Sequence, residues 1–201
     1  MAARDELVNA ALALLEKDGP EGLTTRAVCA EVGVTAPTLY HHFGDLGGLV
    51  DAAVSEGFTR FLQHKRAQLA QDDLGDDLLA GWDNYVAFAR RHPKLYLAMA
   101  AQYATGQANA AAQASRALLD AKLEGLAAQG RLLLPPRAAA EITWSSAHAA
   151  ATLIVSLHPH PPTDEAIAAL RASVERLFVP ARAPAPAKRA KNPTKRNPRN
   201  P

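Results

Sequence analysis

A short polar stretch, GVTAPTLYHHF at residues 33–43, carries side chains suited to recognising another molecule. Thr35 can cap a helix here, and Pro37 suits a first helical turn, where its missing N–H costs nothing. Leu39 and Phe43 lie four residues apart, so they share one face of this helix, which we expect to be buried. The other side and its margins carry polar, small or aromatic side chains: Pro37, Thr38, Tyr40, His41 and His42. This second face is free to contact a partner.

The preceding segment, LTTRAVCAEV at residues 23–32, predicts a second short helix. Thr24 or Thr25 can cap it, and Gly33 suits the left-handed position after its last turn. We expect its inward side chains to be Leu23, Ala27, Val28 and Ala30. Two short helices joined by a glycine-containing turn form a helix-turn-helix, whose second helix enters the major groove of DNA.

Apolar residues recur with helical spacing along the rest of the chain, and runs that alternate apolar and polar residues are nearly absent. We therefore expect an all-α fold of about nine helices. The expected helices outside the helix-turn-helix are 5–17, 46–69, 77–91, 93–103, 108–129, 137–157 and 164–178, with breaks at LGDD (74–77) and GRLLLPP (130–136). The expected domains are a helix-turn-helix domain at 1–47, a larger helical domain at 48–179 and a tail at 180–201.

Composition indicates a globular cytoplasmic protein. Of the 201 residues, 48% are hydrophobic, and the mean hydropathy of −0.12 is typical of soluble chains. The single cysteine, Cys29, excludes an internal disulfide framework and fits a reducing compartment. Asp5 and Glu6 stand where a signal peptide would be basic and then apolar. No apolar run reaches the length of about 18 residues that a membrane span needs.

Charge is distributed unevenly along the chain. Residues 180–201 hold seven basic residues, six prolines and no acidic residue, whereas residues 1–179 hold 15 basic and 20 acidic ones. The composition of the tail predicts a disordered cationic arm. We hypothesise that this arm holds the protein near DNA without sequence preference.

Residues 23–53 resemble the DNA-binding domain of TetR-family transcriptional regulators. The shared elements are the Thr-Thr-Arg start, the Gly-Val-Thr turn, the Thr-Leu-Tyr-x-His-Phe helix and a following leucine. WSSAHAA, with Trp144 and His148, resembles the Trp-x-x-x-His-Gly signature of one C-terminal class of this family, with Ala149 in place of the glycine. ARRHPKLYLAM at residues 89–99 resembles the same class.

The resemblance implies roles for individual residues on the DNA-facing side. Thr25 and Thr35 would offer hydroxyl and helix-start N–H groups to phosphates. Arg26 would reach a base edge or a phosphate, since its fork suits O6 and N7 of guanine. Pro37 and Thr38 would lie against bases. Three side chains would contact the DNA backbone: Tyr40, His41 and His42.

One position departs from the family pattern. Members commonly carry a phosphate-gripping lysine shortly after the recognition helix, but this sequence has Leu46 there, followed by Gly47 and Gly48. The first 47 residues also hold only three basic side chains and a clear excess of acidic ones. This charge balance is unfavourable for a surface that approaches phosphates.

The family resemblance also implies an effector pocket, a homodimer and a regulatory mechanism, with no cofactor. Tyr85, Tyr96, Met99, Tyr103, Trp144 and His148 are the candidate pocket residues. The helices at about 137–157 and 164–178 would form the two-fold interface, through an apolar strip of Leu153, Ile154, Leu157, Ile167, Leu170, Val174 and Leu177. The dimer would then bind a short inverted repeat of double-stranded DNA, with half-sites roughly 34 Å apart. A small apolar or amphipathic effector would release a repressor from this operator.

Three other functions stay open at this level. An enzyme would need chemistry-bearing motifs, and the chain has no glycine-rich phosphate loop, no paired cysteines and no nucleophile-elbow motif. His158 and His160 have a spacing that could bind a metal, although a proline-rich turn between helices explains HPHPP better. An architectural DNA-binding protein driven by the basic tail is the second alternative. A regulator without any effector is the third.

Overall fold

The computed structural model describes residues 2–66, 73–104, 110–156 and 162–180 of the chain. These residues form nine α-helices and one short 3-10 turn, and no β-strand occurs among them. An isolated antiparallel bridge joins Leu132 to Phe178. The predicted all-α fold is confirmed. None of the described helices is both long enough and apolar enough to cross a membrane.

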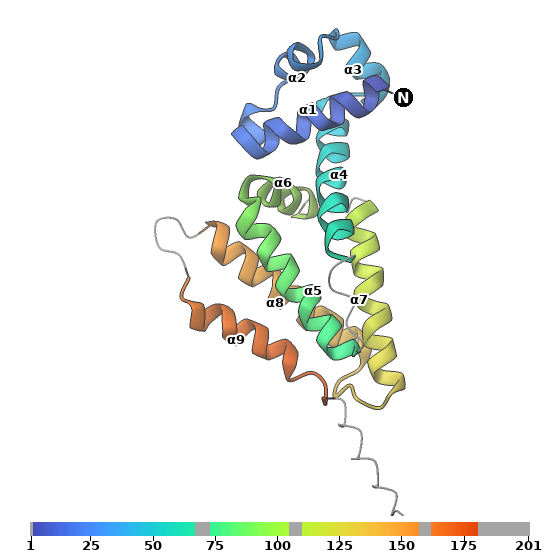
Figure 1. Cartoon of the computed structure of the whole chain (residues 1–201), viewed down its shortest axis with the longest axis vertical. Coiled ribbons are helices and arrows are strands. Elements are labelled where there is room, and N and C mark those ends of the chain that lie inside the picture. Colours follow the sequence, from blue (N-terminus) through green and yellow to red (C-terminus); the bar gives the residue numbers. More distant parts are fainter. Residues whose placement is uncertain (1, 67–72, 105–109, 157–161, 181–201) are drawn as a thin grey trace, which may run out of the picture.

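Three helices at the N-terminal end form a compact group that we call the head. They are α1 (Ala2–Asp18), α2 (Thr25–Val32) and α3 (Ala36–Phe43), with the 3-10 turn Pro20–Gly22 between α1 and α2. Figure 1 shows the head at one end of the molecule, with the N-terminus beside α3. Leu7, Ala11 and Leu15 lie on one side of α1 and are completely buried. They form the surface on which the two shorter helices rest.

The long helix α4 (Leu46–Arg66) leads from the head into a group of five helices that we call the body. The body consists of α5 (Leu74–Arg91), α6 (Pro93–Ala104), α7 (Ala110–Ala128), α8 (Pro136–Ser156) and α9 (Asp164–Glu175). In Figure 1, α6 lies across the upper end of the body, directly beneath α1. The head therefore contacts the body through α6 as well as through α4.

The expected break at LGDD is wrong, because these residues form the first turn of α5. Asp73 caps this helix, and its Oδ1 accepts hydrogen bonds from the N–H groups of Gly75 (2.9 Å) and Asp76 (3.2 Å). The acidic side chains of the first turn also complement the helix dipole. Gly75 is not a helix breaker here. A Cβ atom at this position would lie 2.4 Å from Cε2 of Phe178, so the glycine permits close packing.

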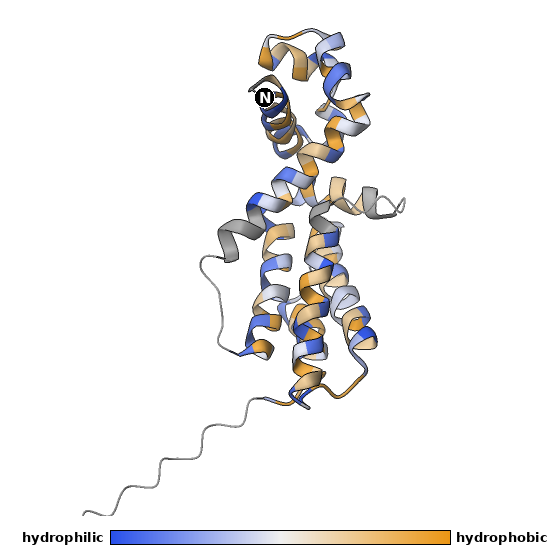
Figure 2. Ribbon diagram, turned by 90° about the vertical axis from the view of Figure 1, so that its right-hand side faces the viewer, coloured by the Kyte–Doolittle hydropathy of each residue, from blue (hydrophilic) through white to orange (hydrophobic). Residues whose placement is uncertain are grey.

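Two hydrophobic cores hold the molecule together. The first core continues from the head through α4 and into α6, with Leu7, Leu39, Val54 and Leu95 among its members. The second core lies among α5, α7, α8 and α9. Figure 2 shows apolar residues along the sides of the body helices that face one another. The continuous first core means that the head does not pack independently of the body.

Three helices meet where the head joins the body. A Cβ atom at Gly57 of α4 would lie 2.8 Å from methyl carbons of Leu12 in α1 and Leu95 in α6. Nearby, Nδ1 of His92 lies 2.9 Å from a carboxylate oxygen of Glu16. The Lys94 ammonium donates a hydrogen bond to the carbonyl of Lys17, which ends α1 against α6. The missing side chain at Gly57 thus allows α1, α4 and α6 to approach one another closely.

At the far end of the body, Arg131 joins three segments of the chain. Its guanidinium donates to both carboxylate oxygens of Asp73, at 2.7 and 3.0 Å, and its Nε donates to the carbonyl of Val179 at 2.9 Å. The hydrogen bonds from Arg131 and, to a smaller extent, from the N–H groups of Asp76 and Gly75 outweigh burial and lower the pKa of Asp73 to about 2. Arg131 therefore holds the start of α5 and the segment that follows α9 together.

The C-terminal helix also corrects part of the expected dimer strip. Helix α9 ends at Glu175 rather than at residue 178. Val174 is completely buried and Leu177 is 5% exposed, and both pack into the second core of the same chain. These two side chains are therefore unavailable to a partner subunit, whereas Leu157 lies outside the described residues.

Candidate nucleic-acid interface and inner aromatic cluster

Helix α2 and the turn that follows it are held by local hydrogen bonds. Thr24 is the residue that caps α2, and its Oγ1 accepts the N–H of Ala27 at 3.1 Å. Gly33 adopts a left-handed conformation with φ of 73°, so Gly33 and Val34 can both donate to the carbonyl of Cys29. Leu23 and Val28 are buried, as predicted. The prediction for Ala30 is wrong, because this residue is exposed.

The predicted recognition helix is α3, which packs against the rest of the head mainly through Leu39. Leu39 is completely buried, and Phe43 is half-buried against the first core. Thr35 occupies the capping position, but its hydroxyl pairs with the hydroxyl of Thr38 at 3.2 Å instead of binding a helix N–H. The Thr35 hydroxyl is exposed and therefore accessible to a partner group.

The side chains predicted to contact DNA are accessible on the outer side of the head. Six are exposed: Arg26, Thr35, Pro37, Tyr40, His41 and His42. Thr25 and Thr38 are half-buried. Tyr40 is 46% exposed, which is unusual for so large a side chain on a helix of eight residues. The rings of His41 and His42 lie 5.3 Å apart at the end of the same helix. Figure 1 shows α2 and α3 adjacent at the free end of the molecule.

The end of α3 and the start of α4 pack closely against each other. Gly44 ends α3 with φ of 80°, and Oδ1 of Asp45 accepts the N–H of Gly48 at 2.8 Å. A Cβ atom at Gly48 would lie 2.2 Å from the carbonyl oxygen of Phe43. The absence of a side chain at Gly48 thus lets the start of α4 support the end of α3.

A second group of predicted site residues meets inside the body, on α5, α6 and α8. Tyr96 is 1% exposed, and its hydroxyl lies 3.0 Å from Nδ1 of His148 and 3.1 Å from Oγ1 of Thr152. The ring of Tyr85 lies 6.0 Å from that of Tyr96 and 5.8 Å from that of Trp144. Trp144, His148 and Thr152 are spaced by four residues, so they lie along one face of α8. We call these five residues the inner aromatic cluster.

Burial sets the charge state of the inner aromatic cluster. It raises the pKa of Tyr96, and hydrogen bonds with Thr152 and Tyr85 act in the opposite direction. It also lowers the pKa of His148. Both groups are therefore neutral near pH 7, and Nδ1 of the neutral imidazole can accept a hydrogen bond from the Tyr96 hydroxyl. The cluster combines aromatic surface with a few polar atoms, as small-molecule sites do.

The structure describes only some of the remaining residues that were predicted to line the pocket or to bind a metal. Met99 is buried in the same core as Tyr96. The side chain of Tyr103 and both His158 and His160 lie outside the described residues. Among the side chains that are described, no group of three His, Cys, Asp or Glu residues could hold a metal ion.

Comparison with known proteins assigns both halves of the chain. Residues 7–53 match the model for bacterial regulatory proteins of the tetR family. Residues 78–177 match the model for the tetracyclin repressor-like C-terminal domain. The chain belongs to the TetR family. The first matched segment contains every predicted DNA-contacting residue, and the second contains every predicted pocket residue.

Individual TetR-family relatives match over limited lengths. The class D tetracycline repressor protein of Escherichia coli is 40% identical over 57 residues, which are 28% of this chain and 26% of that protein. The class C protein of Escherichia coli is 36% identical over 87 residues, covering 43% and 38%. The chain thus matches less than half the length of these curated relatives.

A solved structure matches over almost the whole described fold. A protein of unknown function from Rhodococcus sp. RHA1 has a TM-score of 0.68 and 28% sequence identity. The match covers 88% of this chain and 95% of that one.

Three residues of this TetR-family chain were not predicted from the sequence as parts of these sites: Thr152, Gly48 and Arg4. Thr152 continues the spacing of Trp144 and His148, so this signal was available in the sequence. The close approach at Gly48 has no such signal, because it depends on where the end of α3 lies. Arg4 was also missed, although it contacts the end of α3, as described below.

Neighbouring glycines at the start of α4 provide a test of the α3–α4 contact. We expect Gly48→Ala to reduce the free energy of unfolding by about 1–3 kcal/mol, because the new methyl group overlaps a backbone oxygen. It should also weaken DNA binding by displacing α3. Gly47→Ala is the matched control, since its Cβ would meet only the Asp45 side chain, at 3.1 Å, and no backbone oxygen. This control should range from neutral to about 1 kcal/mol more stable. Urea unfolding with equal midpoints for both variants would show that the contact is unimportant.

Proposed function

We propose that this TetR-family chain is a sequence-specific DNA-binding transcriptional repressor that acts in the cytoplasm. The observation that carries the proposal is the outer surface of α2 and α3, where exposed polar and aromatic side chains stand on a short helix anchored by buried Leu39. A helix of this kind fits the major groove, and its first turns reach base edges.

Each exposed side chain has a role under this proposal. Arg26 reaches a guanine edge or a phosphate, and the Thr25 and Thr35 hydroxyl groups bind phosphates. Pro37 and Thr38 lie against bases, where apolar contact with thymine methyl groups adds specificity. The side chains at the end of α3 contact the DNA backbone: Tyr40, His41 and His42.

We further propose a homodimer that pairs α8 and α9 of each protomer. Small or apolar side chains form exposed stripes on both helices: Ile142, Ser145, Ala149 and Ser156 on α8, with Ala166 and Ala169 on α9. Such stripes allow two helices to approach closely across a two-fold axis. The dimer would present two recognition helices to half-sites about one helical turn apart, so the operator is an inverted repeat.

The proposed effector site is the inner aromatic cluster, and α6 would link it to the head. Leu95 and Tyr96 are neighbours on α6, but Leu95 packs at Gly57 of α4 whereas Tyr96 belongs to the cluster. An effector that displaces Tyr96 would therefore move Leu95, and with it α4. Release follows if the effector favours a conformation in which the two recognition helices no longer match the operator spacing.

In this proposal, residues 1–47 form the DNA-binding domain and residues 48–179 form the effector-binding and dimerisation domain. The continuous first core supports mechanical coupling between them. The basic tail is a candidate for sequence-independent contacts with DNA.

Selection from genomic DNA tests the DNA-binding proposal. Full-length protein is incubated at physiological salt with sheared DNA from its own genome, and the retained fragments are sequenced. We expect one inverted repeat to be enriched, and Thr38→Ala to weaken binding to it by about 10- to 100-fold, because a base contact is lost. Thr59→Ala on α4 is the matched control and should bind like the wild type. Broad retention without a common sequence, unchanged in Thr38→Ala, would favour the architectural alternative instead.

A ligand screen tests the effector proposal. In Trp82→Phe, Trp144 is the single remaining tryptophan of the chain, so its fluorescence reports on the inner aromatic cluster. Among small apolar and amphipathic compounds, we expect binders that raise the Tm by several degrees, change Trp144 fluorescence and release the enriched DNA. His148→Ala should abolish these effects. Leu97→Ala, an exposed position on α6, should retain them. Binders that act equally on His148→Ala, or that leave DNA binding unchanged, would contradict the assigned site.

A further inference from the structure

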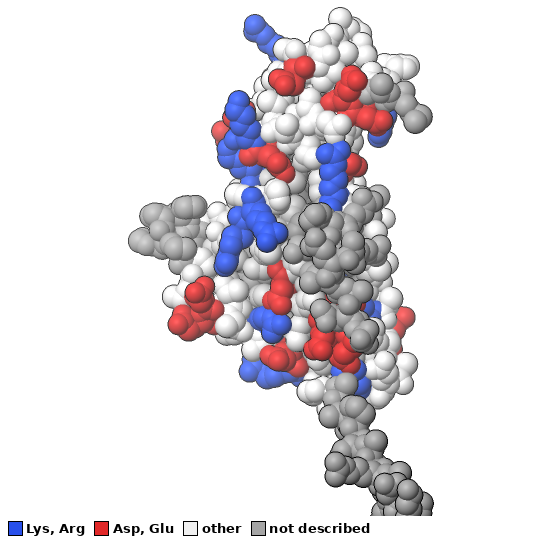
Figure 3. All heavy atoms as spheres, in the orientation of Figure 1, with Lys and Arg blue, Asp and Glu red and all other residues white. Residues whose placement is uncertain are grey.

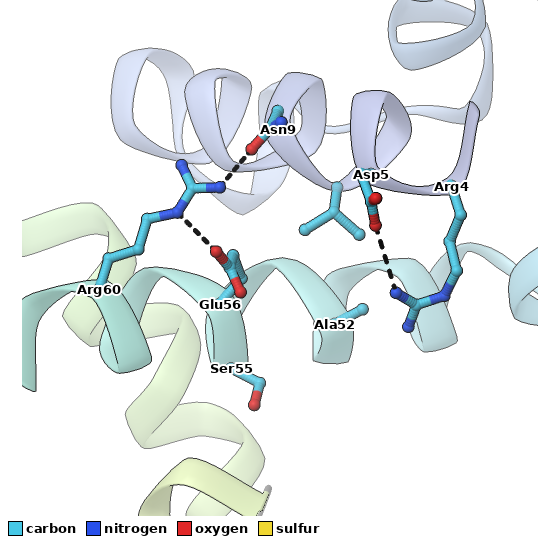
Figure 4. Close-up of a pocket in the computed structure, with 8 residues that line it drawn as sticks. Arg4, Asp5, Asn9, Ala52, Ser55, Glu56 and Arg60 are labelled. Atoms are coloured by element: carbon cyan, nitrogen blue, oxygen red, sulfur yellow. Dashed lines mark hydrogen bonds and ion pairs between the residues drawn. The ribbon is translucent and has the colours of Figure 1, made fainter. Parts of the chain in front are cut away.

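An arginine at the start of α1 lies against the end of the recognition helix. The guanidinium carbon of Arg4 is 5.4 Å from the centroid of the Phe43 ring, and Phe43 is the last residue of α3. The Arg4 side chain is 52% exposed. Figure 4 shows it at one end of the groove between α1 and α4, with Arg60 at the other end.

The two arginines of this groove have different surroundings. Arg60 donates to Glu56 of its own helix, at 2.6 Å, and to Asn9 of α1, so it joins the two helices. Arg4 has a weaker ion pair, 3.9 Å from a carboxylate oxygen of Asp5, and both side chains are largely exposed. Exposed pairs of this kind contribute about 0–1 kcal/mol. The Arg4 guanidinium can therefore exchange this carboxylate for a stronger anionic partner.

Positive charge is scarce near α3. The connection Gly44–Gly48 contains Asp45 as its only charged residue, and the first 47 residues have only Arg4, Lys17 and Arg26 as basic ones. Lys17 lies in the last turn of α1, about 20 Å along the helix from Arg4. Figure 3 shows Lys and Arg side chains of the head mixed with Asp and Glu side chains on the face that it draws. A duplex that approaches α3 thus meets few cations.

We infer that Arg4 of each protomer binds a DNA phosphate beside the C-terminal end of α3, and that the Phe43 ring holds its guanidinium in place. The inference rests on the proposed DNA-binding function. Stacking on an aromatic ring orients the guanidinium plane and leaves its N–H groups free at the edge. A fork oriented in this way can donate two parallel hydrogen bonds to one phosphate. Arg4 thereby supplies the positive charge that Leu46, Gly47 and Gly48 do not.

The salt dependence of binding tests this role. Binding of full-length protein to the inverted-repeat duplex recovered from genomic DNA is measured by fluorescence anisotropy from about 50 to 300 mM salt. Each phosphate contact contributes roughly 0.9 to the slope of log K against log salt. We therefore expect Arg4→Met to reduce the magnitude of the slope by about 0.9 for each protomer, or roughly 1.8 for a dimer. Arg4→Lys keeps the positive charge, so it should keep most of the wild-type slope. Lys17→Met is the matched control and should leave the slope unchanged.

These variants distinguish a phosphate contact of Arg4 from a role of Arg4 in packing. Methionine keeps an apolar contact with Phe43, and the Tm of each variant shows whether the head remains folded. An unchanged slope in Arg4→Met, or equal losses in Arg4→Met and Arg4→Lys, would overturn the inference while leaving the proposed regulator intact. Failure of the wild-type protein to select any inverted repeat would instead refute the proposed function, and the inference with it.

Discussion

The close contact of α1, α4 and α6 at Gly57 determines how the head is placed on the body. Any side chain at this position would meet Leu12 and Leu95 at 2.8 Å, so the three helices approach one another only because Gly57 lacks one. The contact between Nδ1 of His92 and the Glu16 carboxylate lies at the same junction. A motion of α6 cannot leave the head unaffected, because both belong to one continuous core. The orientation of α3 therefore depends on the packing of the body.

Two hydrogen-bonded side chains inside the body, Tyr96 and Trp82, connect its helices. The Tyr96 hydroxyl contacts both His148 and Thr152 on α8, and the indole N–H of Trp82 donates to the buried hydroxyl of Ser146. Leaving one such group without a partner costs about 1–3 kcal/mol. A ligand that enters the inner aromatic cluster must therefore replace the hydrogen bonds that it breaks. This requirement favours an amphipathic effector over a purely apolar one.

The sequence predicted local features well and long-range packing poorly. The cap at Thr24, the left-handed Gly33 and the buried Leu39 follow from rules that act within a few residues, and all three are confirmed. Gly75 was interpreted as a helix breaker, yet it provides space for Phe178, a residue far away in sequence. Arg4 was missed because its contact with Phe43 depends on how α1 crosses α3. The inner aromatic cluster was partly predicted, since aromatic residues with polar atoms are conspicuous in helices rich in alanine.

We propose that two rigidly held recognition helices, one from each protomer, read one inverted repeat. The most direct test inserts five base pairs, about half a helical turn, between the half-sites of the duplex recovered from genomic DNA. We expect the affinity of the full-length protein to fall toward its affinity for unrelated DNA, because the half-sites then face opposite sides of the duplex. A second insertion, ten base pairs in total, places them on the same side but too far apart for the dimer, so binding should stay weak. Unchanged affinity for both lengthened duplexes would show that the two helices do not act as one unit.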